Sequence, residues 1–89
     1  MLKVETAHGS HYFIDQDLKC MMRVRGEGRQ SLDVDDEWVP FETVDAYDIE
    51  SMKRCGDITV GKPMLFILRG MSSWIVSTPV ISIYQRRTR

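Results

Sequence analysis

The stretch Met64-Leu65-Phe66-Ile67-Leu68 is the longest uninterrupted apolar run in the chain, and Arg69 follows it at once. A run of this length suits a strand, whereas a helix that crosses a bilayer needs about 20 apolar residues. Neighbouring side chains of a strand point to opposite faces, so an all-apolar run predicts a central strand that is covered on both faces. The run therefore predicts a β-rich protein that does not span a membrane.

The N-terminal part of the chain predicts a β-hairpin. Residues 2–6 alternate apolar and polar side chains, turn residues follow at 7–10, and β-favouring residues resume at 11–15. A period of two is typical of a half-buried strand, and a glycine in the intervening turn can adopt positive φ.

A third strand is predicted after the next turn. Its even-numbered residues Cys20, Met22 and Val24 form an apolar face, which we expect to lie against the core. The odd-numbered residues Met21 and Arg23 are then expected to face solvent.

The middle of the chain is less regular. Residues 26–36 are polar and contain two glycines, which predicts a long loop, and residues 37–43 resume an extended pattern. Pro40 has no backbone N–H to donate, which favours an edge strand or a bulge there. Residues 45–55 are the one helix candidate, because acidic residues come early, basic residues come late and a glycine follows.

The remaining segments complete a mainly β domain. Short extended pieces are predicted at 58–60, 74–77 and 80–84. Six or seven short strands predict one domain over residues 1–89, either a small antiparallel barrel or a two-layer sandwich, with at most one short helix. Residues 85–89 form a basic tail.

Composition indicates an ordinary globular protein. Hydrophobic residues make up 43% of the chain and charged residues 28%, and the formal net charge is −1. So small a net charge gives no global field that would hold the protein on nucleic acid or an anionic membrane. Two cysteines are too few for a disulfide framework, so we expect free thiols, and charge close to the N-terminus leaves no room for a secretion signal.

Three segments carry a resemblance to known proteins. They are LKVETAHGSHYFID at 2–15, VGKPM at 60–64 and STPVISI at 77–83. Together they resemble small accessory proteins of unknown function from tailed bacteriophages of actinobacteria, in which similar segments open and close the chain. The resemblance implies expression in the cytoplasm of an infected bacterium and an accessory role. It brings no assigned activity and no functional residue.

Four side chains could in principle hold a zinc ion. They are His8, His11, Cys20 and Cys55, and imidazole and thiolate are the usual zinc ligands. Structural zinc sites usually draw closely spaced cysteine pairs from tight knuckles, and no C-x-x-C is present here. We therefore predict no metal site and no cofactor.

The acidic segment 33–37 starts like a calcium-binding loop. Its carboxylates stand at the first, third and fifth positions, but the sixth position is Trp38 instead of glycine and the twelfth is Val44 instead of glutamate. An acidic, solvated loop is the prediction.

No motif predicts catalysis. Cys55 follows two basic residues, which favour the nucleophilic thiolate. A cysteine nucleophile would also need a base and an oxyanion hole, and nothing in the sequence brings a histidine to it. We therefore expect that the protein is not an enzyme, and a small enzyme that uses Cys55 is the third alternative.

The leading hypothesis is a noncatalytic protein-interaction module. Trp38 and Trp74 are predicted as core anchors, and either one would mark an interface if it were exposed. With Tyr84 they form the candidate interaction surface. The partner is either a second copy of the chain or a host protein, and no membrane partner is expected.

The alternative hypothesis is a small β barrel that binds nucleic acid. Basic side chains beside aromatic rings suit single-stranded nucleic acid, although the acidic segment 33–37 would offset them. The candidate patch consists of Arg23, Arg25, Arg29, Arg86 and Arg87.

Overall fold

The structure is a computed structural model, and it describes residues 1–26, 35–70 and 73–85. Over these residues it contains eight β-strands, one 3-10 turn and no α-helix. The strands are β1 (Leu2–Thr6), β2 (His11–Asp15), β3 (Cys20–Val24), β4 (Val39–Asp48), β5 (Lys53–Arg54), β6 (Met64–Leu68), β7 (Trp74–Val76) and β8 (Val80–Gln85), and the 3-10 turn η1 covers Ala7–Gly9. The prediction of a mainly β, antiparallel domain is confirmed, with eight strands instead of six or seven. The N-terminal hairpin is also confirmed as β1 and β2.

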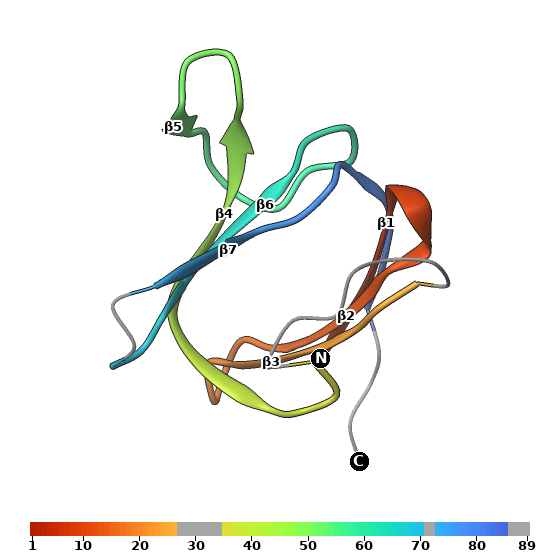
Figure 1. The fold of residues 1–89 in the computed structure, drawn as a ribbon, viewed down its shortest axis with the longest axis vertical. Coiled ribbons are helices and arrows are strands. Elements are labelled where there is room, and N and C mark those ends of the chain that lie inside the picture. The colour runs from red at the N-terminus through yellow and green to blue at the C-terminus, as the bar shows by residue number, and fades with distance from the viewer. Residues whose placement is uncertain (27–34, 71–72, 86–89) are drawn as a thin grey trace.

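All strands belong to one antiparallel sheet that rolls up without closing. The strand order is β7-β6-β4-β3-β2-β1-β8, and β5 pairs with β4 off this path. Figure 1 shows the long strand β4 sweeping from the β3 side of the molecule to β6 and β7, so that it belongs to both halves of the sheet. The last strand, β8, pairs with β1, so that β7 and β8 are the two edges of the sheet.

The segment between β7 and β8 ties the two ends of the sheet together. On one side, the Gly61 N–H donates to the Val80 carbonyl at 2.8 Å, and the Val80 N–H donates to the Lys62 carbonyl at 3.0 Å. On the other side, the Ala7 N–H donates to the Pro79 carbonyl at 2.8 Å. Because the sheet does not close, some backbone groups near its two edges have no partner in a neighbouring strand, and these bonds satisfy them.

The hydrophobic core fills the inside of the rolled sheet, with Phe66 at its centre. The Phe66 ring stacks on Tyr12 with ring centroids 5.6 Å apart, and its centroid lies 5.7 Å from that of Phe41 in an edge-to-face arrangement. Phe66 therefore joins β2, β4 and β6. The buried core cluster consists of Val4, Tyr12, Ile14, Met21, Val39, Phe41, Met64, Phe66, Leu68 and Val80.

The run at 64–68 forms β6, as predicted, and Met64, Leu65, Phe66 and Leu68 are buried. The strand lies one position in from the β7 edge instead of at the centre of the order. The rolled sheet encloses its inner face, on which Met64, Phe66 and Leu68 belong to the core.

Strand β3 presents the opposite face to the core from the one predicted. Met21 and Arg23 are buried, whereas Val24 is exposed. The reason is the register with β2, in which Met21 pairs with Ile14 and Arg23 pairs with Tyr12. Directly paired residues share a face, so both β3 residues point inward with their buried partners.

The predicted helix over residues 45–55 is wrong. Strand β4 continues to Asp48, a turn follows, and β5 pairs back on β4. Asp48 stabilises this turn, because its carboxylate accepts from the Glu50 N–H at 3.2 Å and from the Ser51 hydroxyl at 2.9 Å. Pairing with β6 satisfies backbone N–H and C=O groups of β4 that would have bonded to each other within a helix.

A bulge follows Pro40, in agreement with the sequence. The register of β4 against β6 shifts between Phe41 and Thr43. The shift changes which residues face inward, because Phe41 is buried before it and Ala46 is buried after it. Pro40 itself lies in β4 opposite Cys20, in the interior of the sheet order.

Candidate functional site

The outer face of β6 and β7 carries apolar side chains that a small soluble domain usually buries. Ile67 pairs with Trp74 and Leu65 pairs with Val76, so these four side chains lie together on the side of the sheet that faces away from the core. Trp74 is 66% exposed and Val76 is 43% exposed. Exposed, contiguous apolar side chains of this kind mark interaction sites.

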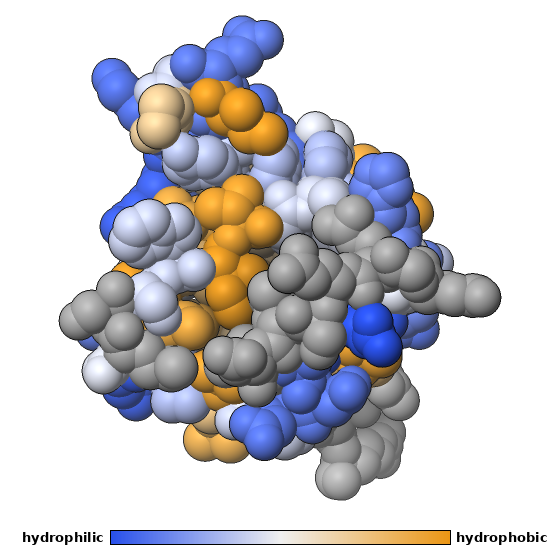
Figure 2. Space-filling view, in the orientation of Figure 1, coloured by the Kyte–Doolittle hydropathy of each residue, from blue (hydrophilic) through white to orange (hydrophobic). Residues whose placement is uncertain are grey.

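A groove runs along this face. It has a volume of about 310 Å³, and its lining residues are Tyr47, Met52, Leu65, Ile67, Trp74 and Val76. Leu65 is almost completely buried, so it forms the floor, while Trp74 and Met52 project from the sides. Figure 2 shows apolar side chains gathered in the region where Figure 1 places β4, β6 and β7.

The β4–β5 hairpin supplies one wall of the groove. Met52 sits in the turn with φ +57° and is 75% exposed. Arg54 and Asp45 hold the hairpin from the side with an ion pair at 3.7 Å, although such an exposed pair contributes little stability. The helix predicted for this segment would not have formed this wall.

The three predicted interaction residues do not lie on one surface. Trp74 belongs to the groove, and Trp38, which is 48% exposed, lines a separate hollow of about 220 Å³ beside Leu18 and Cys20. Tyr84 lies on β8, where the Lys3 ammonium is 5.9 Å from its ring centroid. The prediction that Trp38 and Trp74 anchor the core is wrong, because smaller residues and three packed aromatic rings fill the core.

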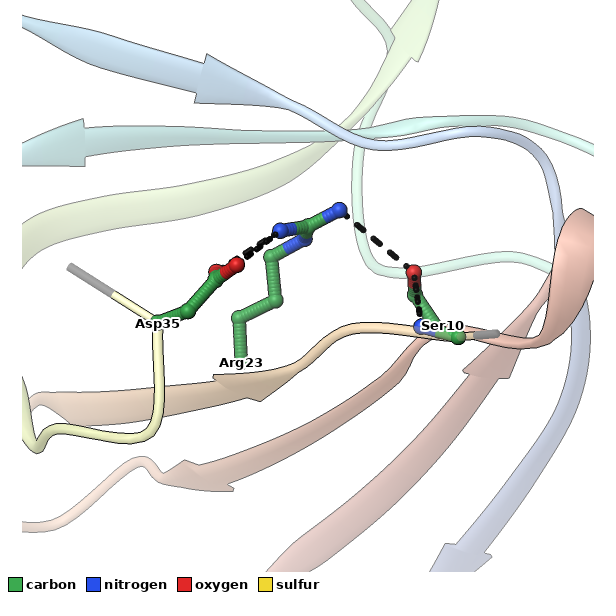
Figure 3. Close-up of polar contacts among 4 residues, drawn as sticks. Ser10, Arg23 and Asp35 are labelled. Carbon is green, nitrogen blue, oxygen red and sulfur yellow. Dashed lines mark hydrogen bonds and ion pairs between the residues drawn. The ribbon is translucent and has the colours of Figure 1, made fainter. Parts of the chain in front are cut away.

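Arg23 projects into the molecule and is held by polar partners. Its Nη1 donates to both carboxylate oxygens of Asp35 at 2.7 Å, and its Nη2 lies 3.5 Å from the Ser10 hydroxyl. The Ser10 hydroxyl also accepts from the Gly26 N–H at 3.1 Å. Figure 3 shows Asp35 and Ser10 on opposite sides of the guanidinium. We call Ser10, Arg23, Gly26 and Asp35 the arginine cluster.

The arginine cluster keeps a charged pair out of water. The side chains of Arg23 and Asp35 are 5% and 4% exposed, and the Arg23 Nε is buried without a hydrogen-bond partner among the residues that the structure describes. Burial on its own lowers the pKa of Arg23, but the hydrogen bond to Asp35 and the nearby Tyr12 raise it, and the net pKa lies above its ordinary value. A raised pKa means that the contribution of Arg23 to stability is present below its unfolded pKa and is lost only at more alkaline pH.

Arg23 is not part of a basic patch, contrary to the prediction. Arg23 is buried, and the face assignment that placed it in solvent is wrong. Arg25 is exposed, and Arg29, Arg86 and Arg87 lie outside the described residues. The structure therefore gathers no arginine patch from the residues that it describes.

Neither candidate metal site is assembled in the described part of the chain. No group of three or more His, Cys, Asp or Glu side chains could hold an ion there. Cys20 is partly buried, Cys55 is exposed, and both are free. In the acidic segment, positions 33 and 34 lie outside the described residues, and Asp35 binds Arg23.

A third hollow lies at the base of the β4–β5 hairpin. It has a volume of about 390 Å³ and a more polar lining, which includes Asp48, Glu50 and Lys62. Oppositely charged side chains face this hollow together, so it selects no single ligand charge.

Comparisons with protein-family models, with curated proteins and with solved structures find no match for this chain. Across residues 1–26, 35–70 and 73–85, no helix is long and apolar enough to cross a membrane.

Sequence reasoning found Trp74 but missed the rest of the groove. Leu65 and Ile67 share one face of the apolar run, and Val76 lies two residues after Trp74. This spacing could have indicated an apolar outer face. The sequence did not reveal that Met52 would come near them, because that depends on the turn that replaces the predicted helix.

Proposed function

We propose that this chain is a noncatalytic binding module that receives an extended segment of a protein along the outer edge of β7. The observation that supports this proposal most strongly is Trp74, which is two-thirds exposed at the side of an apolar groove next to a sheet edge. Tryptophan is enriched among the residues that dominate binding energy.

Both parts of the surface suit an extended segment. An edge strand offers backbone N–H and C=O groups to an incoming strand, and pockets beside it bind alternate side chains. Leu65, Ile67 and Val76 offer an apolar surface to such side chains. The likeness to bacteriophage accessory proteins would place this binding in the cytoplasm of an infected bacterium.

The test uses a library of short unstructured peptides, panned on the purified protein. Peptides that bind the wild type are then compared on Trp74→Ser and on the matched control Trp38→Ser, which removes the same side chain from the other hollow. We expect Trp74→Ser to weaken binding more than about tenfold, because loss of a central aromatic residue costs about 2 kcal/mol or more. The control should bind as the wild type does.

Two results would overturn the proposal. One is a library whose binders depend on Trp38 instead of Trp74. The other is salt-sensitive retention of mixed single-stranded DNA in the absence of peptide binding, which would favour the nucleic-acid alternative.

A further inference from the structure

The edge strand β7 and its flanks have a pattern that reads alike in both directions. The segment Ser73-Trp74-Ile75-Val76-Ser77 has Ile75 at its centre, a large apolar residue on each side of it and a serine at each end. It carries no charge and no proline, which are two of the devices that protect an edge from pairing. Within the described residues, β7 has β6 on one side and no strand on the other.

The hydrogen bonds of β7 show which of its backbone groups face outward. The Ser77 N–H donates to the Met64 carbonyl at 2.9 Å, and the Leu68 N–H donates to the Ser73 carbonyl at 3.0 Å. Residues of an antiparallel strand point their N–H and C=O alternately to one neighbour and to the other. Residues 73, 75 and 77 therefore bond towards β6, and the N–H and C=O groups of Trp74 and Val76 point to the open edge.

From this pattern we infer that β7 pairs antiparallel with β7 of a second copy, with the two-fold axis at Ile75. The inference rests on the proposed function and names the extended segment that the edge receives. In this register Trp74 of each copy lies opposite Val76 of the other. Each such pair exchanges both of its N–H···O bonds, because these two residues carry the outward groups. In this register the outward groups of Trp74 and Val76 in one copy bond to the same groups in the other.

Side chains agree with this register. An aromatic residue opposite a β-branched residue is a favourable cross-strand pair. At each end of the paired segments a serine of one copy lies opposite a serine of the other. The paired segments therefore bring no like charges together. The pairing also places the two grooves side by side on one continuous sheet face, since Trp74 and Val76 belong to both the edge and the groove.

The size of the edge sets the strength of the dimer. A three-residue strand falls short of the roughly 1,200 Å² that stable interfaces bury, so association should be weak and concentration-dependent. The dimer should therefore be visible at high protein concentration and dissociate on dilution.

The first experiment is cross-linking at the axis. Ile75→Cys is made in a Cys20→Ser/Cys55→Ser background and is oxidised mildly. At the axis, the two residues form a non-hydrogen-bonded pair with Cα atoms about 4.5 Å apart, within the disulfide range of about 4.4–6.8 Å. We expect a covalent dimer on a non-reducing gel. The matched control is Ile81→Cys on the opposite edge strand β8, which should stay monomeric.

The second experiment tests the register at exposed positions. Trp74→Lys and Val76→Glu are studied by sedimentation equilibrium, first separately and then mixed. Each alone should associate at least about tenfold more weakly than the wild type. The mixture should regain association, because one substituted residue of each copy then faces the other with opposite charge while the remaining pair stays native.

The outcomes separate this inference from the proposed function. Absent or equal cross-linking of both cysteine variants, or a mixture no stronger than its components, overturns self-pairing. If library peptides still bind in a Trp74-dependent way, the binding module stands and only its partner is wrong. If neither peptides nor a second copy bind, both proposals fall.

Discussion

The two halves of the rolled sheet differ in the charged side chains that they bury. In the half built from β1, β2, β3 and β8, a charged pair lies inside, where Arg23 and Asp35 are almost completely buried. In the half built from β6, β7 and the part of β4 that pairs with β6, the inside is apolar around Phe66, and apolar side chains also lie on the outside, where Trp74 and Val76 are exposed.

This difference separates residues that serve the fold from residues that are free to bind. A buried ion pair costs desolvation, so it must be held in place by its surroundings, here by Ser10 and the neighbouring backbone of Gly26. An exposed tryptophan contributes little to folding and is available to a partner. Substitutions in the two halves should therefore affect stability and binding separately.

The largest loss of stability should come from Phe66→Ala, because Phe66 joins both halves. We expect the free energy of unfolding to fall by about 3–5 kcal/mol, the usual cost of removing a buried phenyl ring. Urea denaturation followed by circular dichroism measures it. A loss below about 1 kcal/mol would show that the stacked and edge-to-face rings do not hold the halves together.

Asp35→Ala should have an effect of about the same size or slightly smaller. It leaves the Arg23 charge buried beside Ser10, and breaking a buried pair from one side costs about 3–5 kcal/mol. The double variant Arg23→Met/Asp35→Leu removes both charges, and its stability should return to within about 1 kcal/mol of the wild type. A double variant as unstable as Asp35→Ala would contradict the view that the lone charge is the cause.

Gly26→Ala should cost less, about 1–3 kcal/mol, by overpacking the arginine cluster. A Cβ at this position would lie 2.5 Å from the His8 carbonyl oxygen and 2.7 Å from the Gly9 carbonyl carbon. Both neighbours are backbone, so the chain itself must move. Thermal denaturation compares this variant with Gly70→Ala, where φ is +71° and an added Cβ would meet no described atom within 4 Å beyond its neighbours in the chain. Gly70→Ala should show only the strain of its backbone, roughly 1 kcal/mol. Equal losses would argue against crowding at Gly26.

Trp74→Ser should have the smallest effect on stability and the largest on binding. The free energy of unfolding should change by no more than about 0.5 kcal/mol, as is usual at exposed positions. The affinity for library peptides should drop more than about tenfold, as measured by fluorescence anisotropy with labelled peptides. If the Trp74→Ser variant unfolds, Trp74 serves the fold instead of binding.

The segments behind the proposed likeness to bacteriophage proteins have structural roles. In the closing segment, the Ser77 hydroxyl accepts from the Met64 N–H at 2.8 Å, and the Thr78 hydroxyl donates to the Ala7 carbonyl at 2.6 Å. The first bond holds the end of β7 against β6, and the second holds the connection between β7 and β8 against the turn that follows β1. Fold geometry alone can thus account for this part of the likeness.

Sequence patterns determined the strands that depend on local alternation and on turn chemistry. The hairpin of β1 and β2, the apolar strand β6 and the bulge after Pro40 follow from side-chain periodicity, from glycine in turns and from the missing proline donor. These signals are local, so they can be read without knowing the neighbours of each strand.

Tertiary structure decided which face of each strand is inside and which segments meet. The alternation in β3 was visible, but only its register with Tyr12 and Ile14 turned Met21 and Arg23 inward. Charge order favoured a helix at 45–55, but pairing with β6 outweighed that weak local preference. The groove beside Trp74 arises from the same pairings, because it joins side chains from segments distant in sequence, and no local pattern encodes such a meeting.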